Sequence, residues 1–222
     1  MISVTLLGIE LIACIIFILF LYKKYTSLGL YIYTIASMIL TCLMSLKTIT
    51  IYDYDLNLGI IPFVTIFIVS NILIQKKGPE EMKTHLLVIL STTILSFIIL
   101  LLVSLMASSK IALFTNASYD NIFDNSIRLL FASIVTMLYS LILNNKLYFY
   151  LKRMKNNIFI SNVFSTIIIQ FIASILFGII AYTFVKDTID IIKLIMVRYL
   201  LSLVVGLIGT IPIYITKYIK EQ

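Results

Sequence analysis

The sequence predicts an all-α fold, a polytopic membrane helical bundle with about seven transmembrane helices, or six as the alternative count. Three observations predict it. Hydrophobic residues make up 61% of the 222 residues, and the mean hydropathy is +1.11. Charged residues make up 12%, about half of the share in soluble domains. Long apolar runs recur between short polar breaks, whereas the strands of a membrane β-barrel would alternate, so we interpret the runs as helices.

Each apolar run is long enough to cross a bilayer, because a helix of about 20 residues spans the hydrocarbon core. The runs cover residues 2–22, 28–46, 58–75, 84–106, 128–147, 160–184 and 191–215. No basic segment precedes the first run, which we interpret as a retained helix and not a signal peptide. The longest break, residues 108–127, is predicted to be a loop. The breaks are too short for a soluble catalytic domain, so we expect one transmembrane domain, residues 1–222.

The cations in the breaks predict the orientation in the cell membrane, because cytoplasmic loops carry an excess of lysine and arginine. Eleven cations follow the first, third, fifth and seventh runs: Lys23, Lys24, Lys76, Lys77, Lys83, Lys146, Lys152, Arg153, Lys155, Lys217 and Lys220. Five lie in the opposite breaks: Lys47, Lys110, Arg128, Lys186 and Lys193. We therefore expect the N-terminus outside and the C-terminus in the cytoplasm.

Composition and motifs argue against several classes of function. The formal net charge is +7, but the lysines lie in separate breaks instead of on one folded face, so we expect no nucleic-acid partner. Cys14 and Cys42 lie inside apolar runs, and we expect neither a disulfide nor a metal site. His85 has no second ligand at metal-binding spacing and is interpreted as an interfacial residue. The sequence lacks Walker, GxSxG and HExxH motifs, so we expect neither an enzyme nor a cofactor.

Two charged residues lie well inside apolar runs, away from their ends: Glu10 in the first and Arg198 in the last. Both are about 10–12 Å from the predicted outer surface, at a rise of 1.5 Å per residue. Because a charge at this depth is costly, we predict that they form an intramembrane charge pair. Such a pair would border a substrate cavity or tie the first and last helices together. The alternative is that each side chain reaches the membrane surface separately.

Uncharged polar residues form a second candidate site in three runs. They are Ser70, Asn71 and Gln75 in the third run, Asn144 and Asn145 at the end of the fifth, and Ser165, Thr166 and Gln170 in the sixth. Asn71 and Gln75 share a helix face because they are four residues apart. Such side chains commonly join helices by hydrogen bonds. The alternative role is substrate contact, because amides and hydroxyls suit the hydrogen-bonding edge of a neutral heterocycle.

The sixth run reads NVFSTIIIQFIASILF from Asn162 to Phe177. It resembles the queuosine-precursor transporters, also called the vitamin uptake transporter (VUT) family, whose corresponding helix carries a pattern like RNxxSTxxxQxxDSxxF. The matching residues are Asn162, Ser165, Thr166, Gln170, Ser174 and Phe177. Further similar landmarks are the segment 70–78, which resembles TDxxxExYG, and Lys152, Arg153, Thr210, Pro212 and Tyr214. The likeness extends from about residue 57 to the C-terminus.

The resemblance implies a multi-pass transporter that imports a small heterocyclic solute, such as queuine or another 7-deazaguanine. It implies a substrate site formed by Ser70, Asn71, Gln75, Asn144, Asn162, Ser165, Thr166 and Gln170. The expected partners are the lipid bilayer and this solute.

The chain departs from the family pattern at its charged positions. Asn71, Gln75, Asn144 and Ala173 stand where the family has acids, and Ser161 stands where it has an arginine. Amides keep the size and hydrogen-bonding capacity of carboxylates but lose the negative charge, so we expect a neutral solute. Two alternatives stay open: a non-transporting scaffold or degenerate paralogue, and the substrate-binding subunit of an energy-coupling-factor transporter, which would require an ATPase module.

Overall fold

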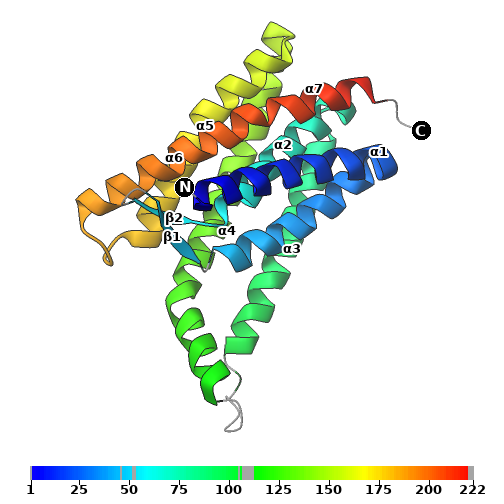
Figure 1. Cartoon of the computed structure of the whole chain (residues 1–222). Coiled ribbons are helices and arrows are strands. Elements are labelled where there is room, and N and C mark those ends of the chain that lie inside the picture. Colours follow the sequence, from blue (N-terminus) through cyan, green and yellow to red (C-terminus); the bar gives the residue numbers. More distant parts are fainter. Residues whose placement is uncertain (1, 46, 52–53, 105, 107–112, 220–222) are drawn as a thin grey trace.

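The computed structural model describes the whole chain except residues 1, 46, 52–53, 105, 107–112 and 220–222. Its elements are α1 (Ile2–Met44), β1 (Thr48–Ile51), β2 (Tyr54–Asn57), α2 (Ile60–Lys77), α3 (Glu81–Ser104), α4 (Leu113–Lys155), α5 (Ile158–Tyr182), α6 (Thr188–Ile208) and α7 (Thr210–Tyr218). Figure 1 shows the helices gathered into a bundle, which confirms the predicted helical fold. Within the described residues, five stretches are long and apolar enough to cross a membrane: Ser3–Met44, Ile60–Lys77, Glu81–Val103, Ile158–Tyr182 and Thr188–Tyr218.

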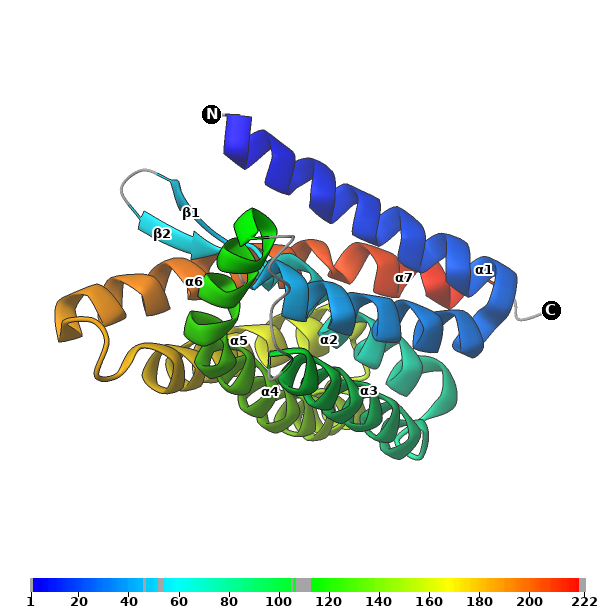
Figure 2. The same ribbon diagram turned by 90° about the horizontal axis from the view of Figure 1, so that it is seen from below.

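The helix α1 reverses direction within its own bounds. Thr26 has φ 52° and ψ −131°, which is not helical, and it divides α1 into two arms. The arms run side by side in opposite directions in both ribbon views (Figures 1 and 2). A Cβ on Gly29 would overlap the backbone carbonyl of Leu21, so the close approach of the two arms depends on this glycine. The two arms agree with the first and second predicted spans.

A two-stranded antiparallel hairpin follows α1, and the all-helical prediction did not include it. Its strands pair with Thr48 opposite Asn57. Asn57 also closes the base of the hairpin, because its Nδ2 donates to the Ser45 carbonyl at 2.7 Å and its Oδ1 accepts from the Gly59 backbone N–H at 2.9 Å. The first strand consists of threonine and isoleucine, which favour extended backbone. The hairpin packs against α6.

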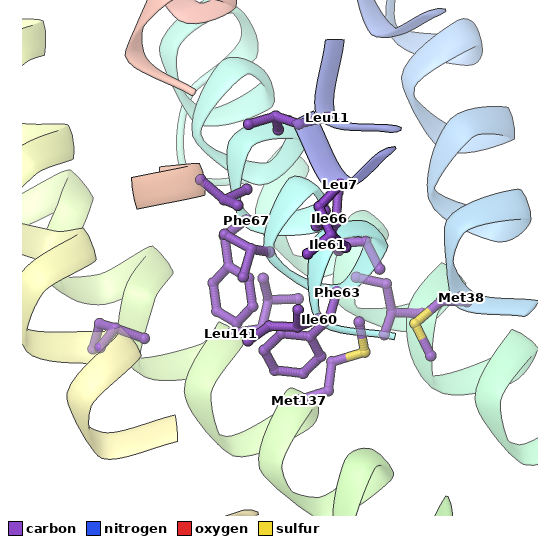
Figure 3. Close-up of a cluster of buried hydrophobic side chains, with 14 of the residues drawn as sticks. Leu7, Leu11, Met38, Ile60, Ile61, Phe63, Ile66, Phe67, Met137 and Leu141 are labelled. Atoms are coloured by element: carbon purple, nitrogen blue, oxygen red, sulfur yellow. The ribbon is translucent and has the colours of Figure 1, made fainter. Parts of the chain in front are cut away.

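The helix α2 lies at the centre of the bundle. Its residues from Ile60 to Ile74 are all buried, and it packs against α1, α3, α4, α6 and α7. In Figure 3 the Phe63 ring of α2 lies near Met137 of α4, and Phe67 belongs to the same buried cluster. The surrounding helices instead leave large apolar side chains exposed, for example Phe164 of α5. This distribution is expected when lipid covers the outer faces, and it makes α2 the helix best placed to carry interior polar groups.

The helix α4 is much longer than its predicted span, residues 128–147. It begins at Leu113, so most of the stretch predicted as a loop, residues 108–127, is helical, and the rest lies outside the described residues. The polar residues in this stretch lower its hydropathy, but α4 contains neither proline nor glycine, so nothing in it breaks a helix. In Figure 1 the end of α3 and the start of α4 project away from the other helices.

The last predicted span is divided into α6 and α7. Gly209 separates them, and its N–H still bonds to the Val205 carbonyl at 2.9 Å. Pro212 follows in the first turn of α7, and it lacks the N–H that would continue the backbone ladder. A Cβ on Gly209 would overlap the Ile68 side chain of α2. The break therefore lies directly against the central helix.

Candidate functional site: a buried amide ladder

Three asparagines from α4, α2 and α5 form a chain of hydrogen bonds inside the bundle, which we call the amide ladder (Asn144, Asn71 and Asn162). Asn144 Nδ2 donates to Asn71 Oδ1 at 2.9 Å, and Asn71 Nδ2 donates to Asn162 Oδ1 at 2.8 Å. All three side chains are at most 2% exposed. Each amide donates to the next, so the ladder fixes the orientation of all three groups.

The ladder continues into the break between α6 and α7. Asn162 Nδ2 donates to Thr210 Oγ1 at 2.8 Å and to the Gly206 carbonyl at 3.1 Å. A Cβ on Gly206 would overlap Thr166 Cγ2, so α5 and α6 approach closely here because residue 206 is a glycine. The ladder thus joins the central helix α2 to the boundary between α6 and α7.

The remaining predicted site residues are buried or half-buried around the ladder. Ser70 Oγ donates to Asn145 Oδ1 at 2.5 Å, and Ser165 Oγ donates to the Asn162 carbonyl at 3.1 Å. Thr166 and Gln170 are buried on the same face of α5 as Asn162. Gln75 is half-buried, one turn beyond Asn71. The predicted polar residues of three separate spans therefore meet in one region.

Several buried polar atoms on the helices of the ladder have no hydrogen-bond partner among the described residues. They include Thr136 Oγ1, Ser140 Oγ and Asn145 Nδ2 of α4, Gln75 Oε1 of α2, and Ser174 Oγ of α5, which is about three turns from Asn162. Thr136, Ser140 and Asn144 recur every four residues and so share one face of α4. An unpaired buried polar group costs about 1–3 kcal/mol. These atoms are therefore candidates for contact with a bound solute or water.

Sequence reasoning did not select Thr136 or Ser140. Both lie in an apolar run, where isolated hydroxyls commonly bond to their own helix. The signal that identifies them is their spacing from Asn144, because a polar stripe with a period of four residues lines one helix face. Ser174 was found only through the family pattern, one turn beyond Gln170.

The charge pair predicted between Glu10 and Arg198 is not formed. Among the residues that the structure describes, no ion pair joins the two, and Arg198 Cζ lies 3.9 Å from the ring centroid of Phe177 and 5.1 Å from that of Phe63. An apolar groove, lined by residues such as Leu7 of α1 and Val197 of α6, runs between these helices. Equal depth therefore did not bring the two charges together, and the aromatic faces stabilise the buried guanidinium instead.

His85, interpreted from the sequence as an interfacial residue, is fully buried between α3 and α1. Its Nε2 lies 2.9 Å from Thr34 Oγ1 of α1, and Tyr31 of the same arm donates to Glu81 Oε1 at 2.6 Å. Packing of α3 against α1 covers this ring. Among the described residues, no group of three His, Cys, Asp or Glu side chains is placed to hold a metal ion.

Two cavities lie toward opposite ends of α5. A small one of about 20 Å³, room for a single water molecule, is lined by Ser174, Phe177 and Arg198 near the hairpin. A larger one of about 400 Å³ is lined by Gln75, Lys152 and other polar residues where α2 ends and α5 begins. Asn162, the α5 member of the amide ladder, lies between the two cavities along α5.

The fold and this interior define the class of protein, a multi-pass helical membrane protein with uncharged polar side chains at its centre. A family model described as "Putative vitamin uptake transporter" matches residues 57–216, so the chain belongs to that family. The match runs from the end of β2 into α7 and includes the whole amide ladder. Comparisons with curated proteins and with solved structures give no match. The chain is thus a membrane protein of a transporter family, as the resemblance in the sixth span implied.

Proposed function

We propose that this protein imports a small, neutral, hydrogen-bonding heterocycle, and that the amide ladder and the hydroxyls beside it form the solute site. The observation that carries the proposal is the ladder itself, in which uncharged amides of three helices converge inside the bundle. A 7-deazaguanine such as queuine is the candidate solute that the sequence resemblance names. Family membership supports transport but specifies no substrate.

The chemistry of the site favours a neutral solute. Each amide offers both donors and an acceptor, which can pair with the mixed donor and acceptor edge of a heterocycle. The positions that hold acids in the resembled family hold Asn71, Gln75 and Asn144 here, so no carboxylate of these positions is available to a cation. The unpartnered atoms Asn145 Nδ2 and Ser140 Oγ add a donor and a hydroxyl beside the ladder.

In this structure the three amides bond to one another, and the ladder also reaches the break between α6 and α7. Asn162 bonds to both sides of this break through Gly206 and Thr210. A solute that replaces the Asn71–Asn162 bond would free α5 and α7 to move relative to α2.

The structure also supports the proposed orientation, with the N-terminus outside. Lys76, Lys152 and Lys217 come from three different elements that the cation pattern assigns to the cytoplasm, and they line one cavity at one end of the bundle. An excess of lysine at one end is the property that orients helical membrane proteins.

Uptake of labelled queuine and 7-cyano-7-deazaguanine by cells that lack their own importer tests this function. We expect accumulation when the intact chain is expressed, and none with the double variant Asn71→Leu and Gln170→Leu at equal membrane abundance. Ser91→Ala is the control, because Ser91 is exposed on α3 and bonds to its own helix at Val88. Equal uptake by the double variant would show that these residues join helices without contacting the solute. Uptake that depends on co-expressed ATPases would identify the energy-coupling-factor alternative, and no uptake of either compound would favour the scaffold.

A further inference from the structure

A basic cavity of about 400 Å³ lies at the end of the bundle where α2 and α4 end and α5 begins. Its polar and charged lining consists of Gln75, Lys76, Lys152, Asn156, Asn157, Tyr214 and Lys217. The three lysines come from α2, α4 and α7, so the cavity exists because these elements meet. It lies outside the amide ladder, which is one turn further into the bundle.

The three ammonium groups have no carboxylate partner among the residues that the structure describes. Lys152 Nζ donates to the backbone carbonyl of Gln75 at 3.2 Å, and Lys76 Nζ donates to the backbone carbonyl of Ile219 at 3.0 Å. Lys217 Nζ lies 6.0 Å from the Tyr218 ring centroid. An ammonium group carries three donors, so each retains hydrogen-bonding capacity beyond these contacts. Burial lowers the pKa of Lys152. An anion beside the ammonium group would raise this pKa again, because it favours the charged form.

Other groups of the lining suit the same ligand. Helix α5 begins here, with Asn157 as its N-cap, and the N-terminus of this 25-residue helix adds positive potential. Tyr214 can donate a hydrogen bond through its hydroxyl. Neither aspartate nor glutamate lines the cavity, so nothing in the lining opposes an anion.

We infer that this cavity binds a phosphate-bearing anion, with Lys76, Lys152 and Lys217 as its cationic ligands. Phosphate fits the site because its several oxygens can accept from more than one ammonium group at once. The anion has two possible sources, the headgroup of an anionic lipid or a free phosphate ester on the same side of the membrane. The inference does not rest on the proposed transport of a heterocycle, because the three lysines are not part of the solute site, although Gln75 borders both.

The test measures unfolding midpoints of the full-length protein in neutral detergent at constant ionic strength. One arm adds inorganic phosphate, and the other adds phosphatidylglycerol or, for comparison, phosphatidylcholine. We expect phosphate, phosphatidylglycerol or both to raise the midpoint by several degrees, because a ligand of the folded state stabilises it. Stabilisation by phosphate assigns the site to a free phosphate, and stabilisation by phosphatidylglycerol alone assigns it to a lipid headgroup.

A matched pair of triple variants separates the cavity from general charge effects. Lys76→Gln, Lys152→Gln and Lys217→Gln together should weaken half-saturation by about tenfold or more. The control, Lys23→Gln, Lys24→Gln and Lys155→Gln, removes the same charge from exposed positions and should leave binding unchanged. If the first triple variant does not fold, Lys217→Gln alone is the test variant. Its side chain is exposed, so the protein should still fold, and binding should weaken several-fold. Equal weakening in test and control variants, or no stabilisation by either ligand, would overturn the inference.

Discussion

The side-chain amide of Asn71 donates to Asn162 Oδ1 at 2.8 Å and thereby joins α2 to α5. Asn71 is also the acceptor for Asn144, so it is the one rung of the ladder with two asparagine partners. Asn71 therefore links α4 and α5 through the central helix, and we expect both the stability of the bundle and the proposed site to depend on it.

Replacement of Asn71 should destabilise the protein more than replacement of Asn144, which has one bond in the ladder where Asn71 has two. Asn71→Leu leaves both Asn144 Nδ2 and Asn162 Oδ1 unpaired, and each buried unpaired group costs about 1–3 kcal/mol. A double-mutant cycle between Asn71 and Asn162, measured by unfolding in detergent, should give a coupling of about 0.5–3 kcal/mol. Additive effects would show that the bond contributes nothing to stability.

The unpaired hydroxyls of α4 should serve function and not stability. Thr136→Val and Ser140→Ala each remove a buried group without a described partner, so the unfolding midpoint should stay equal or rise, while solute uptake falls. Thr92→Val is the matched control, because Thr92 bonds to Val88 of its own helix and should leave uptake unchanged. A clear loss of stability in Ser140→Ala would indicate a structural role instead.

Arg198 should couple to Phe177 and not to Glu10. Its guanidinium lies over the Phe177 ring at 3.9 Å, a cation–π contact worth about 0.5–2 kcal/mol. Double-mutant cycles with Arg198→Gln, Phe177→Leu and Glu10→Gln should show this coupling for the aromatic pair and about none for the charge pair. A larger coupling between Arg198 and Glu10 would restore the ion pair that the sequence predicted.

Gly206 should tolerate no side chain unless its neighbour is shortened. Gly206→Ala places a methyl group against Thr166 Cγ2 and should lower the unfolding midpoint by several degrees, as overpacking of a core does. Thr166→Ser removes that methyl group and should recover much of the loss in the double variant. Gly8→Ala is the control, because a Cβ there meets nothing within 4 Å. Failure of Thr166→Ser to rescue would mean that the clash lies elsewhere.

The sequence predicts most of the helices because a helix that contacts lipid must be apolar over the thickness of the membrane, and hydropathy detects such a stretch. It predicts less well whatever depends on which helices are neighbours. Glu10 and Arg198 lie at similar depth, but a groove runs between their helices, and depth says nothing of lateral position. His85 lies near a helix end yet is buried, because α3 packs against α1.

The candidate site was partly predictable for the same reason. Helical spacing placed Asn71 and Gln75 on one face and Thr166 and Gln170 on another, and both faces are buried or half-buried. The order of donors and acceptors in the amide ladder depends on how α2, α4 and α5 pack together. The spacing of polar residues within one helix does not reveal that packing. The hairpin after α1 was missed because strands of four residues leave no signal between two apolar runs.

The most direct test of the central claim is uptake of labelled 7-cyano-7-deazaguanine and queuine by proteoliposomes that contain the purified protein and no other. We predict that at least one compound accumulates, that an excess of the unlabelled compound competes, and that Asn71→Leu abolishes accumulation while Ser91→Ala does not. If neither compound accumulates, or if Asn71→Leu protein of equal abundance accumulates it as fast as the unmodified chain, the amide ladder is not a transport site for such a solute.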